Sequence, residues 1–62
     1  MNNQLSQKEL MYLEDALSME ADEVNKFRLA ASQAQDAQAK SVLQNIADMH
    51  QGHFNTLKQY LG

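Results

Sequence analysis

The stretch Ser-Gln-Ala-Gln-Asp at residues 32–36 decides the fold, because it separates two apolar stripes that one straight helix cannot align. The stripe before it consists of Leu10, Leu13, Leu17, Glu20, Val24, Phe27 and Ala31. The stripe after it consists of Leu43, Ile46, His50, His53, Leu57 and Tyr60. Both advance in steps of three and four, as residues on one side of a helix do. If one helix continued through this stretch, the first stripe would next fall on Asn45, Asp48 and Gly52, which carry polar side chains or none. We therefore expect the chain to turn.

Signals for helix ends agree with this turn. Ser6 followed by Glu9 forms the capping-box pattern of a helix start, Asp36 is a good N-cap, and Gly62 suits the position after a helix. The chain has no proline and is rich in alanine, glutamine and leucine, which favours helix over strand. We therefore predict an all-α, single helical-hairpin domain over residues 1–62, with helices at about 7–32 and 37–61 and a turn at about 33–36.

A chain of 62 residues without cysteine needs a metal, a partner chain or very good helix packing for stability. Apolar residues flank both stripes, so the apolar face is wider than one partner helix can cover. We expect two antiparallel hairpins to pack as a homodimeric four-helix bundle. A helical turn, with long helices exchanged across the dimer, stays open as an alternative.

Charge and composition restrict the class of protein. Five lysines and arginines stand against eight aspartates and glutamates, with no basic cluster, so nucleic acid is not an expected partner. We expect no membrane span and no signal peptide, and therefore synthesis in the cytoplasm without export. Neither a serine–histidine–acid arrangement nor a glycine-rich phosphate loop is evident, and the sequence assigns no catalytic residue.

Three ionisable residues stand where the stripes should be apolar. Folding the helices antiparallel about residue 35 pairs positions whose numbers sum to 70, which places Glu20 opposite His50 and Leu17 opposite His53. All three ionisable groups then face a dry interior. Because an uncompensated buried charge is costly, these side chains must satisfy one another or hold something.

A metal ion is one interpretation of this layer. Imidazole and carboxylate together suit zinc, iron, manganese or copper, and two histidines three residues apart project to one side of a helix. His50 and His53 would share the ion, Glu20 would supply an oxygen, and Glu23 would be an outer ligand. The His-x-x-His pattern differs from the Glu-x-x-His of di-iron bundles, which argues against oxygen activation.

A structural role is the other interpretation. Glu20 and His50 would form a charge-assisted hydrogen bond that fixes register and partner choice, as isolated polar core residues do in coiled coils. Stability should then fall in acid, whereas a metal site should respond to a chelator. Both interpretations stay open on the sequence.

Two segments, LSQKELMYLEDALSMEADEV at 5–24 and VLQNIADMHQGHFNTLKQYL at 42–61, resemble the spore coat protein F-like family. These are small ferritin-like helical proteins of endospore-forming bacteria. The resemblance rests on the run Ile46 to Phe54 with Leu57, and on Leu13, Glu14, Asp15 and Glu20 in the first half. Longer relatives hold four helices in one chain, which again implies a dimer. The family implies a location in the spore or its coat, and other coat proteins as partners.

Two functions follow as expectations. The first is a spore-coat type of structural or assembly protein, a dimeric bundle with a central layer of glutamate and histidine that binds metal or stabilises the fold. The second is a small ferritin-like metalloprotein that stores, buffers or oxidises a divalent transition metal such as zinc, iron or manganese.

Overall fold

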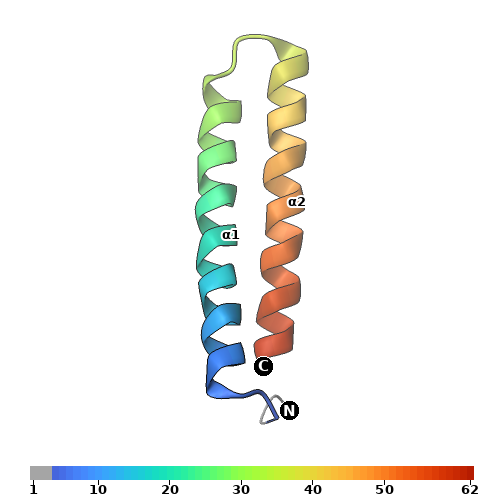
Figure 1. Ribbon diagram of the computed structural model, residues 1–62. Helices are drawn as coiled ribbons and strands as arrows, with labels where there is room; N and C mark the ends of the chain where they lie inside the picture. The colour runs from blue at the N-terminus through green and yellow to red at the C-terminus, as the bar shows by residue number, and fades with distance from the viewer. Residues whose placement is uncertain (1–3) are drawn as a thin grey trace.

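The protein is an antiparallel helical hairpin. The computed structural model describes residues 4–62, in which helix α1 spans Gln7–Gln33 and helix α2 spans Ala37–Leu61 (Figure 1). No strand occurs within this range. Both helices lie within one residue of the predicted bounds, and the predicted turn is confirmed at residues 34–36. The start of α1 and the end of α2 lie at the same end of the hairpin (Figure 1).

Side chains close the helix ends as the sequence predicts. The Ser6 hydroxyl accepts a hydrogen bond from the Glu9 backbone N–H at 3.0 Å, and the Glu9 carboxylate accepts one from the Ser6 N–H at 2.9 Å. Asp36 caps α2 by accepting from the Ala39 N–H at 2.7 Å. Gly62 follows α2 with a φ of 114°, a left-handed conformation that suits glycine. These local bonds define where each helix begins or ends.

The core between the two helices is small. Only Val24, Ala31 and Ala47 are buried among the apolar residues of the described chain, and Ala47 is the most enclosed at 0% exposure. The predicted stripe did not contain Ala47, and it did contain Tyr60, which is 51% exposed. That part of the prediction is wrong: α2 is rotated so that Ala47 faces α1, because a small side chain allows the two helices to approach closely.

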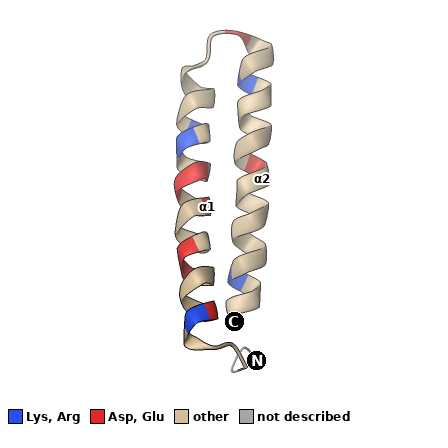
Figure 2. Cartoon of the chain, in the orientation of Figure 1, with Lys and Arg blue, Asp and Glu red and all other residues tan. Residues whose placement is uncertain are grey.

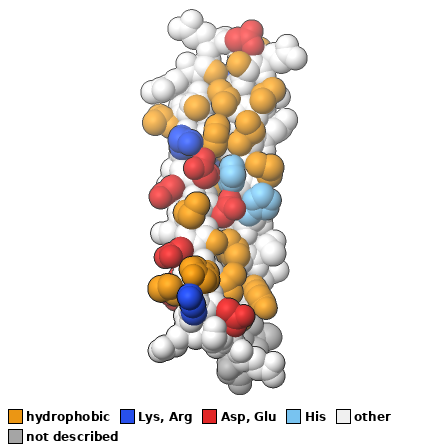
Figure 3. All heavy atoms as spheres, viewed as in Figure 1, with side chains coloured by type: hydrophobic (Ala, Val, Ile, Leu, Met, Phe, Trp, Pro, Cys, Tyr) orange, Lys and Arg blue, Asp and Glu red, His pale blue; other side chains and the backbone are white. Residues whose placement is uncertain are grey.

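The hairpin has two unlike faces. We call one the cluster face: it carries Glu20, His50 and His53 together with the apolar side chains that lie on the same side of each helix, away from Val24 and Ala47. Its apolar members are Tyr12, Ala16, Met19, Phe27, Val42, Ile46, Met49, Leu57 and Tyr60. Figure 3 shows such a face, with apolar side chains above and below the two histidines. Four of these apolar residues, Tyr12, Met19, Val42 and Tyr60, are at least half exposed.

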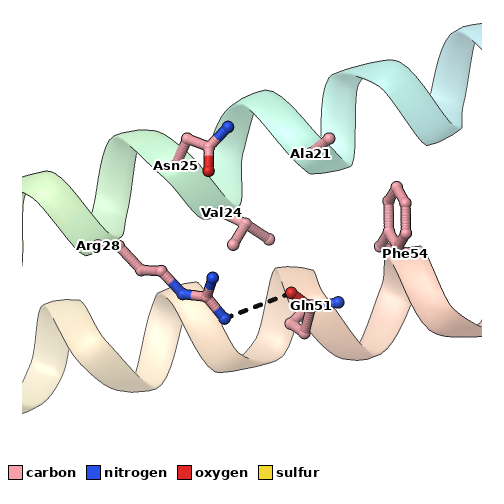
Figure 4. A pocket seen from close by; sticks show the side chains of 6 residues that line it. All are labelled: Ala21, Val24, Asn25, Arg28, Gln51 and Phe54. Atoms are coloured by element: carbon pink, nitrogen blue, oxygen red, sulfur yellow. Dashed lines mark hydrogen bonds between the residues drawn. The ribbon is translucent and has the colours of Figure 1, made fainter.

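The opposite, polar face carries amides and charges. Gln44 donates to Asp48 at 3.1 Å and Gln51 donates to Asn55 at 3.0 Å, along one side of α2. From α1, Arg28 donates to the Gln51 side-chain oxygen at 3.4 Å, across a groove of about 120 Å³ (Figure 4). Among the exposed large apolar residues of the described chain, Tyr12, Met19, Val42, Met49 and Tyr60 lie on the cluster face, whereas Leu10, Met11 and Leu29 lie outside it.

Charge is also divided unequally between the helices (Figure 2). Helix α1 contains three basic and six acidic side chains, for a net charge of −3 with neutral histidines. Helix α2 contains two basic side chains and one acidic side chain, for a net charge of +1. The two helices thus present surfaces of opposite sign.

Replacing Gly52 by alanine should stabilise the hairpin. Gly52 lies in the interior of α2, and a Cβ added there would meet nothing within 4 Å. Alanine is favoured over glycine in a helix interior by about 1 kcal/mol, so Gly52→Ala should raise the free energy of unfolding by up to that amount. Urea denaturation followed by circular dichroism measures the change. A loss of stability would show that another chain or group approaches this backbone.

Candidate metal centre

One carboxylate from the middle of α1 contacts two imidazoles from the middle of α2. Glu20 Oε1 lies 2.6 Å from His50 Nδ1, and Glu20 Oε2 lies 3.3 Å from His53 Nδ1. The predicted pairing of Glu20 with His50 is confirmed. His53 was expected opposite Leu17, but it also reaches Glu20, so both oxygens of the carboxylate are used. We call these three residues the Glu/His cluster.

The Glu/His cluster lies at the surface of the hairpin. The side chains of His50 and Glu20 are 20% and 22% exposed, and that of His53 is 55% exposed. The expectation that all three face a dry interior is therefore wrong for the hairpin. Two helices cover a side chain from one direction only, and the cluster lies on the edge of their contact. A further layer of protein would be needed to exclude water.

Aromatic contacts hold the imidazole of His50. The Phe27 ring is stacked on it, with ring centroids 5.9 Å apart and planes inclined by 10°. His53 meets the same imidazole edge to face at 5.8 Å. Lys26 Nζ lies 5.1 Å from the centroid of Phe27. Sequence reasoning assigned Phe27 to the apolar stripe and missed this positioning role, although it stands seven residues, or two helical turns, from Glu20.

The histidines keep the Glu20 carboxylate ionised. The hydrogen bond from His50 is the main cause that lowers the pKa of Glu20, and the charge of His53 acts in the same direction. Partial burial acts against them by raising the pKa. An ionised carboxylate accepts hydrogen bonds only, so each imidazole that bonds to it must donate from Nδ1. The cluster without metal is thus an anion held by two N–H donors.

The same three side chains lie close enough to hold a metal ion. One ligand atom from each of Glu20, His50 and His53 lies within 4.8 Å of the other two. Ligands about 2.1 Å from a tetrahedral ion are about 3.4 Å apart, close to the 3.3 Å between His53 Nδ1 and Glu20 Oε2. The shorter distance to His50 would have to lengthen by less than 1 Å. Metal binding would displace the protons on the Nδ1 atoms, so the hydrogen-bonded and metal-bound forms compete.

Glu23 lies outside the cluster. This predicted outer ligand is not among the three residues that could share an ion. Its Oε1 lies 3.2 Å from Lys26 Nζ, one turn further along α1, in a largely exposed ion pair. The structure therefore brings together three of the four predicted ligands.

Comparisons with known proteins leave the chain without an assigned family. No protein-family model, curated protein or solved structure matches it. Within residues 4–62, neither helix has both the length and the apolar character that crossing a membrane requires. The interpretation of the site therefore rests on its own geometry.

Acid should weaken the metal-free protein through Glu20. Because the folded-state pKa of Glu20 is lowered from the ordinary value of 4.5, the contribution of Glu20 to stability is present above that pH. The contribution is lost as the pH falls through the folded-state pKa. Urea denaturation in the presence of a chelator should show a falling free energy of unfolding below about pH 4.5, with a shallower slope in Glu20→Gln. Glu14→Gln, an exposed position of α1, is the matched control. Equal slopes in all three proteins would contradict the assignment.

Proposed function

We propose that the hairpin is half of a homodimeric four-helix bundle that serves as a structural or assembly protein. The size of the core is the observation that carries this proposal: three small residues are buried, while four large apolar residues of the cluster face are at least half exposed. The face formed by the two helices measures 47 × 15 Å, or about 700 Å² in projection. A standard interface buries about 800 Å² per partner, so a second hairpin matches the face in size.

Sedimentation equilibrium tests the dimer. A chain of 7.0 kDa should behave as a particle of about 14 kDa, twice that mass. Met19→Glu places a charge on the cluster face and should shift the protein to monomer, because a charge in an apolar interface is costly. Met11→Glu makes the same change at an exposed methionine outside the cluster face and should leave the dimer intact. A wild-type monomer at all concentrations, or equal effects of the two variants, would contradict the proposal.

The resemblance to the spore coat protein F-like family supports a place in the spore, with other coat proteins as partners. The cluster face of the described hairpin, with its exposed apolar side chains, suits an architectural role. In a spore-forming source organism, the chain should fractionate with the coat layers and require harsh extraction. Antibody detection only in the cytoplasm of growing cells would contradict this location.

A second candidate function is favoured by the Glu/His cluster: a small ferritin-like metalloprotein that stores, buffers or oxidises a divalent transition metal. Two imidazoles and one carboxylate are ligands that zinc, iron and manganese accept. Protein purified without added metal should contain such a metal by elemental analysis, and Glu20→Ala should lose it. A substoichiometric metal content that Glu20→Ala does not change would remove the basis of this candidate.

A further inference from the structure

We propose that a second copy of the chain completes the metal site, so that one divalent transition-metal ion is shared by two hairpins and links metal binding to dimerisation. The ion would be held by Glu20, His50 and His53 of one chain and by the partner's His53. This inference rests on the proposed dimer. It adds that metal binding promotes dimerisation and that each dimer holds one ion.

The site is incomplete in a single hairpin. It offers three protein ligands, whereas structural zinc sites have four. All three ligands come from the hairpin side, so the vacant coordination position must point away from the hairpin. His53, the outermost member with 55% of its side chain exposed, lies on that side. A fourth protein ligand can therefore come only from a molecule that covers the cluster face.

The position of the cluster on its face suits a second copy. Glu20 is the central residue of α1, and His50 lies one residue past the centre of α2. Exposed apolar side chains lie toward both ends, with Tyr12 and Tyr60 on one side of the cluster and Val42 on the other. If a twofold-related hairpin docked on this face, apolar contacts on both sides of the cluster would exclude water from it. The two clusters would then lie at the same height along the bundle.

Charge favours one way of docking. Because α1 carries a net charge of −3 and α2 a net charge of +1, each α1 should lie against the α2 of the other copy. A twofold axis along the bundle produces this arrangement and makes all neighbouring helices antiparallel. It also places Glu20 opposite α2 of the other copy, the helix that carries the partner's His53. The fourth ligand can therefore come from that helix.

The charge of the two Glu/His clusters sets the number of metal ions in the dimer. Two clusters contribute two carboxylates, and one divalent ion neutralises both, which lowers the cost of removing water from the interface. An ion that uses the partner's His53 also takes that ligand from the partner's own cluster. Both considerations give one ion for each pair of chains.

Sedimentation velocity during a titration with Zn²⁺ tests the inference, starting from chelator-treated protein. The dimer fraction should rise until half an equivalent of Zn²⁺ per chain has been added and then stay constant. The dimer dissociation constant should fall at least tenfold. Co²⁺ should produce the intense visible absorption of a four-coordinate ion with its endpoint at the same ratio.

Two variants complete the experiment. His53→Asn changes an exposed side chain, so the hairpin should fold, which circular dichroism checks; the effect of Zn²⁺ on the dimer should be lost. Glu23→Gln, which alters a carboxylate outside the cluster, should titrate as the wild type does.

The outcomes separate this inference from the functions proposed above. An endpoint at one equivalent with the protein still monomeric would overturn the shared site and leave the metalloprotein candidate standing. A dimer of equal strength in chelator, in Zn²⁺ and in His53→Asn would also overturn it, but would leave the structural dimer standing. A monomer under every condition would overturn both the dimer and the shared site.

Discussion

Ala47→Asp is expected to unfold the hairpin. Among residues 4–62, Ala47 alone has no exposed surface, and it lies where α2 faces α1. An aspartate there would have to bury its carboxylate in the contact between the two helices, or force the helices apart. Either outcome costs several kcal/mol, a large share of the stability of so small a domain. The helical signal in circular dichroism at 25 °C should fall by more than half.

The matched control is Asn45→Asp. Asn45 is exposed and lies two residues away in the same helix, so this variant tests the helix propensity and added charge of aspartate without burying it. Its free energy of unfolding should stay within about 0.5 kcal/mol of the wild type, as for most surface substitutions. If both variants remained equally folded, the close contact of the helices at Ala47 would be refuted.

The double variant Glu20→Leu/His50→Leu is expected to abolish metal binding without unfolding the protein. Loss of outer-shell partners alone typically weakens metal sites 10- to 100-fold, so loss of two ligands should lower the affinity for Zn²⁺ more than about 100-fold. Stability should be unchanged or higher, because two leucines that pack together at this partly exposed position can replace the Glu20–His50 pair without loss, as apolar residues often do for buried ion pairs. Competition with a colorimetric chelator measures the affinity, and urea denaturation measures the stability.

Two single variants make the second prediction specific. His50→Leu alone leaves Glu20 with His53 as its sole partner in the cluster, so it should destabilise the metal-free protein more than the double variant does. Glu23→Leu removes a carboxylate of the same helix from outside the cluster and should keep the affinity for Zn²⁺. A double variant that bound Zn²⁺ as tightly as the wild type would exclude the cluster as the metal site.

Local signals made the fold predictable. The capping box at Ser6 and Glu9 and the N-cap at Asp36 act within a few residues, and the sequence placed each of them correctly. The break in the apolar pattern at residues 32–36 located the turn, because the phase of the second stripe does not continue that of the first. Since the turn fixes the register of an antiparallel pair, the contact between Glu20 and His50 was also predictable.

The phase of α2 was less predictable than its bounds. A stripe through Ile46 and Tyr60 and a line through Ala47 differ by a rotation of less than a third of a turn, and both contain apolar residues at helical spacing. The sequence pattern favoured the stripe with the larger side chains as the side of α2 that contacts α1. The structure instead places small Ala47 against α1, which leaves Tyr60 and His53 exposed. Close approach of two helices depends on side-chain volume, which a periodic pattern does not describe.

The hairpin returns the chain to where it began, with the end of α2 beside the start of α1 (Figure 1). A tandem gene fusion could therefore join two copies head to tail through a short flexible linker, without crossing the length of the bundle. In such a fusion the two halves would be encoded separately, so one histidine could be changed while its duplicate is kept. Dilution would no longer separate the two halves of the fused protein, because the linker keeps them together.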